Sequence, residues 1–167
     1  MYDWELTDGA LKAWVRLRQA SDTVEKLLET GLGKQDATLA QIDVLGILSI
    51  SKGPLTPGEI ASYTFRQQHS ASAQLSRMWR AGLVTKSRSK KDQRVVRIKM
   101  QPKGKDLFKE TRQAGFGQAR ELFSSCLSHE ETEQLDRLLK KVRDHALQQL
   151  GAKAVPLPNT IDLPDSC

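Results

Sequence analysis

The sequence has few cysteines, few aromatic residues and no long apolar run. Cys126 and Cys167 are the only cysteines among 167 residues, which excludes a disulfide scaffold and fits a reducing compartment. Aromatic residues make up 5% of the chain, so a core must be mostly aliphatic. No apolar run approaches the ~20 residues needed to span a bilayer. The acidic segment Met1–Glu5 lacks the pattern of a secretory signal. We therefore expect a cytoplasmic protein with no membrane partner, built as one compact domain or as a small domain with appendages.

Positive charge is abundant but concentrated in one segment. Twelve Lys or Arg residues and one acid, Asp92, lie between Arg66 and Lys105, while the whole chain carries a net charge of only +6. The remainder of the chain is therefore acidic. A segregated basic segment favours a polyanionic partner such as nucleic acid. A solvated basic face is the alternative, although it explains a diffuse excess of charge better than a localised one.

Capping signals and apolar spacing predict most of the helices. A first helix is expected over about 7–28, where apolar residues recur at helical spacing and Gly31 and Gly33 end the pattern. Capping boxes at Thr38, Thr56 and Ser128 predict three further helix starts. Helices are also expected over 68–81 and from Pro102 to Cys126, with a bend plausible at Gly115 and Gly117.

The helix predicted over 68–81 has a thin apolar side and many polar side chains, which suits contact with something polar. Two short β-rich runs follow it, 83–87 and 95–100, and they are joined by a basic, polar tip. The order of helices, strand, basic tip and strand is that of a winged helix-turn-helix, whose second helix enters the major groove while the hairpin tip reaches the adjacent backbone or minor groove.

The sequence also resembles the MarR family of bacterial transcriptional regulators over about residues 7–150. The motifs that carry the resemblance are Leu55-Thr56-Pro57-Gly58-Glu59-Ile60-Ala61, Arg80-Ala81-Gly82-Leu83-Val84, Asp92-Gln93-Arg94 and Met100-Gln101-Pro102-Lys103-Gly104. The resemblance implies a mainly α fold with a small antiparallel β-hairpin, in which a winged helix-turn-helix lobe is joined to a helical dimerisation region. It also implies a homodimer that binds a palindromic operator in double-stranded DNA, most simply as a ligand-responsive repressor.

Four segments follow from this comparison. We expect an N-terminal dimerisation helix over 1–35, a DNA-binding lobe over 36–101, C-terminal dimerisation helices over 102–150 and a disordered tail over 151–167. The apolar stripe from Leu135 to Leu150 supports dimerisation independently, since an uncovered stripe would be a liability in solution. The alternative is that these helices fold back on their own lobe.

The recognition helix departs from the family where Ala71-Ser72-Ala73 replaces a branched run that normally ends in Arg. Base reading is therefore assigned to the neighbouring polar residues, namely Gln67, Gln68, His69, Ser70, Ser72, Gln74 and Arg77. In the wing, Asp92 is expected to pair with an arginine and fix the loop. Either Arg94, or Arg88 together with Lys90 and Lys91, is then expected to enter the minor groove or clamp phosphate.

Other signals are weaker. The resemblance suggests a cleft for a small aromatic or phenolic effector, for which we name Trp14, Leu17, Leu48, Phe108 and Arg112. The alternative is that the apolar residues of this set belong to the core. His69, His129 and His145 do not have metal-ligand spacing. We interpret Cys126 as a buried structural residue rather than a redox switch. No catalytic arrangement or cofactor motif is found, so we expect neither an enzyme nor a cofactor. The alternative to a regulator is a winged-helix scaffold that binds protein or RNA without reading bases.

Overall fold

The computed structural model describes residues 5–32, 37–51, 53–88 and 92–152. Its elements, in chain order, are α1 (Gly9–Leu32), α2 (Leu39–Ile50), α3 (Pro57–Tyr63), α4 (Gln68–Arg80), β1 (Val84–Arg88), β2 (Val96–Met100), α5 (Pro102–Cys126) and α6 (His129–Gln149). The fold is mainly helical with one antiparallel hairpin, as the sequence predicts. The segment 153–167, which contains most of the predicted tail, lies outside the described residues.

The helix starts follow from local hydrogen bonding. Thr38, Thr56 and Ser128 each accept a hydrogen bond from a backbone N–H three residues later, and the side chain of that third residue bonds back to the cap. All three predicted capping boxes are therefore confirmed. Helix α1 ends four residues beyond its predicted C-terminal limit, at Leu32, so Gly31 lies inside the helix. Helix α5 runs unbroken through Gly115 and Gly117.

Two glycines allow the chain to turn closely between α4, β1 and α5. Gly82 has a φ of +74°, and the backbone N–H of Leu83 donates back to the carbonyl oxygen of Met78 over 2.9 Å. This left-handed glycine reverses the chain from the end of α4 into β1. Gly104 lies against the backbone of Leu83, where a Cβ would collide with the carbonyl oxygen. A residue without a side chain is thus required where α5 starts beneath the hairpin.

The core lies between α2, α3, α4, the hairpin and the first half of α5. Phe108 is the aromatic member of an otherwise aliphatic set among the described residues, as the composition requires. The buried cluster consists of Leu32, Ile42, Val44, Leu45, Leu48, Ile60, Leu75, Met78, Leu83, Val84, Ile98, Met100 and Phe108. These elements form a rigid lobe on which α4 and the hairpin are displayed.

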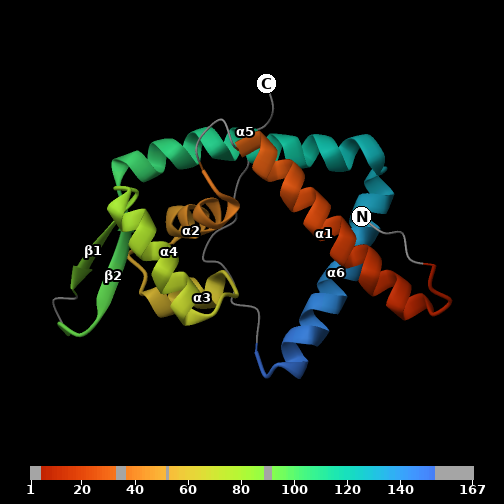
Figure 1. Cartoon of the computed structure of the whole chain (residues 1–167), viewed down its shortest axis with the longest axis horizontal. Helices are drawn as coiled ribbons and strands as arrows, with labels where there is room; N and C mark the ends of the chain where they lie inside the picture. Colours follow the sequence, from red (N-terminus) through yellow and green to blue (C-terminus); the bar gives the residue numbers. More distant parts are fainter. Residues whose placement is uncertain (1–4, 33–36, 52, 89–91, 153–167) are drawn as a thin grey trace.

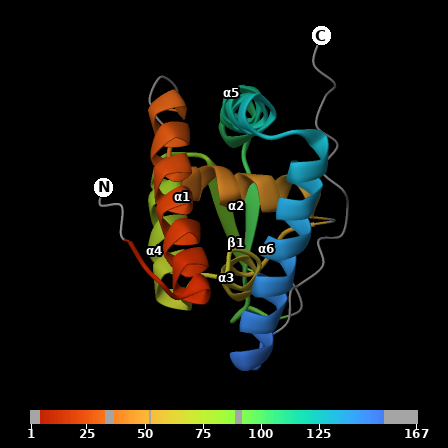
Figure 2. The ribbon, with the colours of Figure 1, turned by 90° about the vertical axis from the view of Figure 1, so that its right-hand side faces the viewer.

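The three long helices extend away from this lobe (Figure 1). Helix α5 leads outward from the hairpin, α1 packs against α5 and α2, and α6 turns back from the far end of α5. Viewed along α5, α1 and α6 lie on opposite sides of it (Figure 2). No residue of α6 is buried. In the part of the chain that the structure describes, no helix combines the length and apolarity that crossing a bilayer requires.

Candidate nucleic-acid interface

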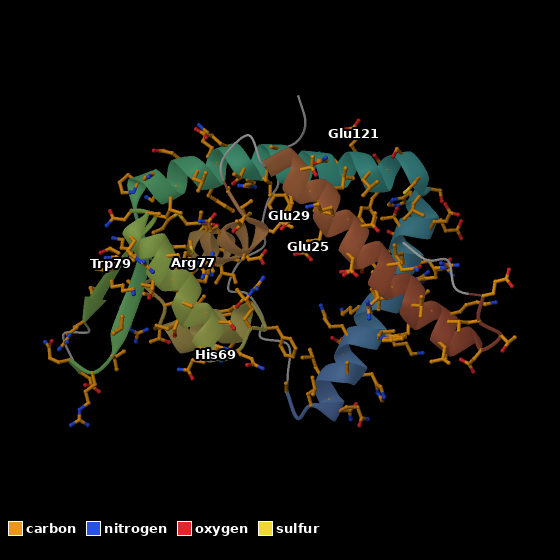
Figure 3. The ribbon with its side chains drawn as sticks, viewed as in Figure 1. Glu25, Glu29, His69, Arg77, Trp79 and Glu121 are labelled. Atoms are coloured by element: carbon orange, nitrogen blue, oxygen red, sulfur yellow. The ribbon has the colours of Figure 1, made fainter. Side chains whose placement is uncertain are left out.

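Helix α4 has one face in the core and the opposite face in solvent. Ala71, Gln74, Leu75 and Met78 are buried and fix the orientation of the helix on the lobe. The residues predicted to read bases, apart from Gln74, are all exposed, and these are Gln67, Gln68, His69, Ser70, Ser72 and Arg77. His69 lies near the N-terminal end of α4, and Arg77 lies two turns further along (Figure 3). The structure thus presents a polar helix face with its hydrogen-bonding groups directed outward.

Gln74 is the exception, and its inclusion in the base-reading set is wrong. Its side chain is only 9% exposed, because it lies three residues after Ala71 and four before Met78 on the core side of the helix. Its Oε1 accepts a hydrogen bond from Nη2 of Arg77 over 2.7 Å. Gln74 therefore holds the Arg77 guanidinium from behind and does not itself reach outward.

The hairpin places further positive charge beside α4. Strands β1 and β2 pair antiparallel from Val84 with Met100 to Arg88 with Val96. Arg88 and Arg94 are exposed at the two sides of the tip. Lys90 and Lys91, which were predicted to bind phosphate, lie outside the described residues. Among described residues, the hairpin and α4 therefore form a continuous surface that is predominantly basic.

Asp92 organises the tip through the backbone. Its Oδ1 accepts a hydrogen bond from the backbone N–H of Arg94 over 2.9 Å, and its carbonyl oxygen accepts one from the N–H of Val95 over 3.0 Å. The sequence predicts a pairing of Asp92 with an arginine side chain, but among the described residues Asp92 forms no salt bridge and bonds to the backbone of Arg94 instead. A short carboxylate two residues before an N–H forms this local turn readily, and Arg94 remains exposed.

The turn between α3 and α4 joins this surface to a groove on the other side of the lobe. Phe65 has a φ of +50° and is 65% exposed, and Arg66 donates its backbone N–H to the carbonyl oxygen of Ala61 over 3.0 Å. The Arg66 guanidinium lies 3.8 Å from the Asp43 carboxylate of α2. The first turn of α4 is thus connected through Arg66 to α2.

The groove lies between α1, α2 and α5 and has a volume of about 1140 Å³. Leu17 and Phe108 line it, as predicted for an effector cleft. The other three predicted residues do not. Leu48 is buried in the core, Trp14 is 56% exposed beside Arg18, and Arg112 is not part of the lining. The wall is mainly apolar. Its polar residues come from α1, α2, the end of α3 and the turn before α4, namely Arg16, Ser21, Glu25, Asp43, Tyr63, Thr64 and Arg66. Among them, Asp43 interacts with Arg66 and Glu25, and these three residues form the polar end of the groove.

Asp43 is the perturbed acid of this polar end. Loss of surrounding water raises the pKa of its carboxyl above the ordinary value, the Arg66 guanidinium opposes this rise, and the Glu25 carboxylate adds to it. Glu25 projects from α1 toward the space between α1 and the lobe (Figure 3). The sequence could not identify this pair, because Asp43 and Arg66 meet only when α2 and the α3–α4 turn pack together.

The remaining candidate groups do not form a site. Cys126 is exposed at the end of α5, which corrects its interpretation as a buried residue, since none of the described residues covers its side chain. His129 lies 3.5 Å from Glu133 one turn along α6. Over the described ranges, no cluster of three or more His, Cys, Asp or Glu residues is arranged to hold a metal ion.

Comparisons with known proteins agree with this geometry. A model described as MarR family matches residues 35–95. No curated protein has a significantly similar sequence. Among solved structures, the organohalide-sensing transcriptional regulator RdhR-CbdbA1625 bound to 2,4-dichlorophenol has a TM-score of 0.84 and 23% identity, and the match covers 98% of this chain and 96% of that one.

Two further structures are similar. AbsC, a MarR-family transcriptional regulator from Streptomyces coelicolor, has a TM-score of 0.78 and 25% identity, with 89% of this chain and 100% of that one covered. A mutant MarR from E. coli, complexed with operator DNA, has a TM-score of 0.75 and 22% identity, and the match covers 83% of this chain and 99% of that one. The winged-helix lobe and the long flanking helices of this chain are therefore a shared architecture.

Proposed function

We propose that this chain is a transcriptional regulator of the MarR family, whose model matches residues 35–95, and that it binds double-stranded DNA in a sequence-specific way and acts as a repressor in the cytoplasm. The observation that carries the proposal is the concentration of net positive charge in the segment 66–105, which contains α4 and the hairpin. Such a surface matches the phosphate backbone, while the rest of the chain is acidic. The similar structures are also named as transcriptional regulators and not as enzymes.

In the proposed complex, α4 lies in the major groove. Gln68 can pair with adenine and Arg77 with guanine, each at about 1–3 kcal/mol of discrimination for a good bidentate contact. Gln74 supports this role, because its hydrogen bond restricts the Arg77 guanidinium. Arg88 and Arg94, together with Lys90 and Lys91 at the tip, would contact phosphate or the adjacent minor groove.

We further propose that the protein is a homodimer. Three apolar side chains of α6 and its C-cap are well exposed in the single chain, Leu138 at 54%, Val142 at 56% and the C-cap residue Leu150 at 68%. A stripe of this size on a long helix with no buried residue is unfavourable unless a second copy covers it. A twofold dimer would place two copies of α4 about one DNA turn, ~34 Å, apart, so the operator would be palindromic.

The groove between α1, α2 and α5 is the proposed site for a small aromatic or phenolic effector. It offers an apolar wall containing Leu17 and Phe108 and a polar end containing Asp43 and Arg66. Since Arg66 immediately precedes the exposed start of α4, an occupant of the polar end would act directly on the orientation of the recognition helix. The similar structure with bound 2,4-dichlorophenol supports testing this ligand class.

Selection of bound sequences from a pool of random duplexes tests the proposal. We expect enrichment of an inverted repeat and a binding constant that falls steeply with salt. Exposed basic residues outside the interface offer a control, since Lys141→Gln on α6 should leave both the motif and the salt dependence unchanged. Binding without any enriched sequence, or equal binding of RNA, would instead favour a winged-helix scaffold that does not read bases.

A further inference from the structure

An exposed tryptophan on α4 is held together with a lysine of the hairpin. The Trp79 side chain is 52% exposed, and Nζ of Lys86 lies 5.2 Å from the centroid of its ring. The same Nζ donates a hydrogen bond to Oγ of Ser76 over 3.1 Å. Trp79 lies at the edge of α4 that faces the hairpin, while Arg77 lies at the other edge (Figure 3). The Lys86 ammonium is thus positioned by two contacts from the recognition helix.

The register of the hairpin explains the direction of Lys86. Lys86 pairs with Ile98, and directly paired residues project from the same face of a sheet. Ile98 is fully buried against the lobe, so Lys86 leaves the hairpin on the face toward α4. Lys99, which pairs with Thr85, projects from the opposite face. Lys86 and Lys99 therefore project from opposite faces of the same hairpin, and Lys86 is on the face toward α4.

Ser76 is half-buried on α4, one turn from the exposed Ser72 and two turns from the exposed His69. The ammonium of Lys86 consequently occupies the angle between α4 and the hairpin. When a winged helix binds DNA with α4 in the major groove and the hairpin at the adjacent minor groove, one sugar–phosphate strand separates the two grooves and passes through this angle. A fixed cation there faces a phosphate.

We propose that Lys86 is a preordered phosphate-binding residue of the DNA interface and that Trp79 is its platform, packing against the neighbouring deoxyribose. This inference rests on the proposed DNA binding. A lysine that is already oriented loses less side-chain freedom when it meets a phosphate than a mobile one. The indole also presents an apolar surface to the sugar, and amphipathic aromatic rings suit such contacts. Helix and wing thus hold one DNA strand between them.

The test compares Lys86→Met with Lys99→Met, which removes the same charge from the other face of the same hairpin. Affinity for a duplex is measured by fluorescence anisotropy over a series of salt concentrations. One lost phosphate contact is expected to lower the slope of log affinity against log salt by about 0.9, which corresponds to about eightfold weaker binding at 0.1 M salt. Lys99→Met should leave the slope within error of the unmodified protein.

Trp79 provides a second measurement. In a protein carrying Trp4→Phe and Trp14→Phe, Trp79 is the sole remaining tryptophan. Its emission should change when duplex DNA is added at low salt, and the change should reverse at high salt. Lys86→Arg keeps the charge and should leave the slope of log affinity against log salt unchanged. Trp79→Leu should weaken DNA binding but lower this slope by less than the value of about 0.9 for one phosphate contact.

A purely structural link between hairpin and α4 predicts different results. In that case Lys86→Met would lower the thermal unfolding temperature and leave the salt slope unchanged, and emission from Trp79 would not respond to DNA. Those results, obtained while the unmodified protein binds DNA, would overturn this inference alone. Failure of the unmodified protein to bind any duplex would overturn the proposed function as well.

Discussion

The guanidinium of Arg97 on β2 lies 3.3 Å from Oε2 of Glu59 near the start of α3. The same carboxylate oxygen accepts hydrogen bonds from the backbone N–H and the hydroxyl of Thr56, over 2.6 Å and 2.9 Å. Arg97 also donates to the carbonyl oxygen of Pro54 over 3.3 Å. One carboxylate thus joins the second strand of the hairpin to the first helix of the helix-turn-helix.

Glu59 should make stability depend on pH in the acidic range. The hydrogen bond from the Thr56 backbone, and to a smaller extent the Arg97 charge, hold the pKa of Glu59 below its ordinary value. A carboxyl with a lowered pKa in the folded state stabilises the protein above its unfolded pKa, and this contribution is lost as pH falls through the folded pKa. Glu59→Gln should therefore unfold at a lower temperature than the unmodified protein at pH 7, and the difference should narrow below pH 4.

Glu59→Gln should lower the free energy of unfolding by less than about 1 kcal/mol, because the Glu59 carboxylate is about half exposed and water screens its ion pair with Arg97. Gln also preserves a capping box, as Gln41 does after Thr38. Thermal unfolding by circular dichroism between pH 3 and 7 measures the effect, with Glu110→Gln on the exposed side of α5 as the control. A difference that widens on acidification would contradict this assignment.

Two glycines of α5 should respond oppositely to the same substitution. Gly104→Ala places a methyl group against the Leu83 carbonyl and is expected to destabilise the fold by about 1–3 kcal/mol, typical of overpacking. Gly117→Ala meets no atom within 4 Å and should stabilise the helix by up to about 1 kcal/mol. Urea denaturation of both variants measures the change in the free energy of unfolding. Equal changes in the two variants would show that the close contact with Leu83 does not require glycine at position 104.

A charge on the apolar face of α6 should separate the proposed dimer. Val142→Glu places a carboxylate where a second copy would exclude water, an arrangement that is costly without a partner charge. Gln148→Glu introduces the same acid on the other side of α6. We expect sedimentation velocity to give a dimer for the control and a monomer for Val142→Glu at micromolar concentration. Two dimers, or two monomers together with a monomeric unmodified protein, would exclude α6 as the contact.

Filling the groove should weaken effector binding. Ala20 lines the groove from α1, so Ala20→Trp places an indole inside it. Asp22→Trp adds the same side chain to α1 outside the lining. Titration calorimetry with a chlorinated phenol should show affinity reduced by on the order of tenfold or more only for Ala20→Trp. Equal heats from both variants would place the ligand elsewhere.

The sequence predicted those features of the fold that depend on neighbouring residues. The three capping boxes at Thr38, Thr56 and Ser128 were readable because each is complete within four residues. Helix-turn-helix and hairpin order followed from apolar spacing and turn residues. Several limits of the elements shifted by one to four residues, as at the end of α1, while both limits of α5 are those predicted.

Features that depend on packing between elements were not readable in the same way. Gln74 was assigned to the polar face by its chemistry, although its spacing from Ala71 and Met78 places it on the core side. The sequence places Leu48 and Trp14 in a cleft, but the packing of α1, α2 and α5 buries Leu48 in the core and leaves Trp14 exposed outside the groove. Lys86 and Trp79 meet only because the hairpin register directs Lys86 toward α4.

Duplex selection repeated with Arg77→Ala tests most directly whether α4 reads bases in the major groove of a twofold complex. The account predicts that preference is lost at two positions related by the dyad of the inverted repeat, while the other positions keep theirs and the salt slope stays nearly constant. An unchanged motif with uniformly weaker binding would contradict it, because Arg77 would then contact only the DNA backbone.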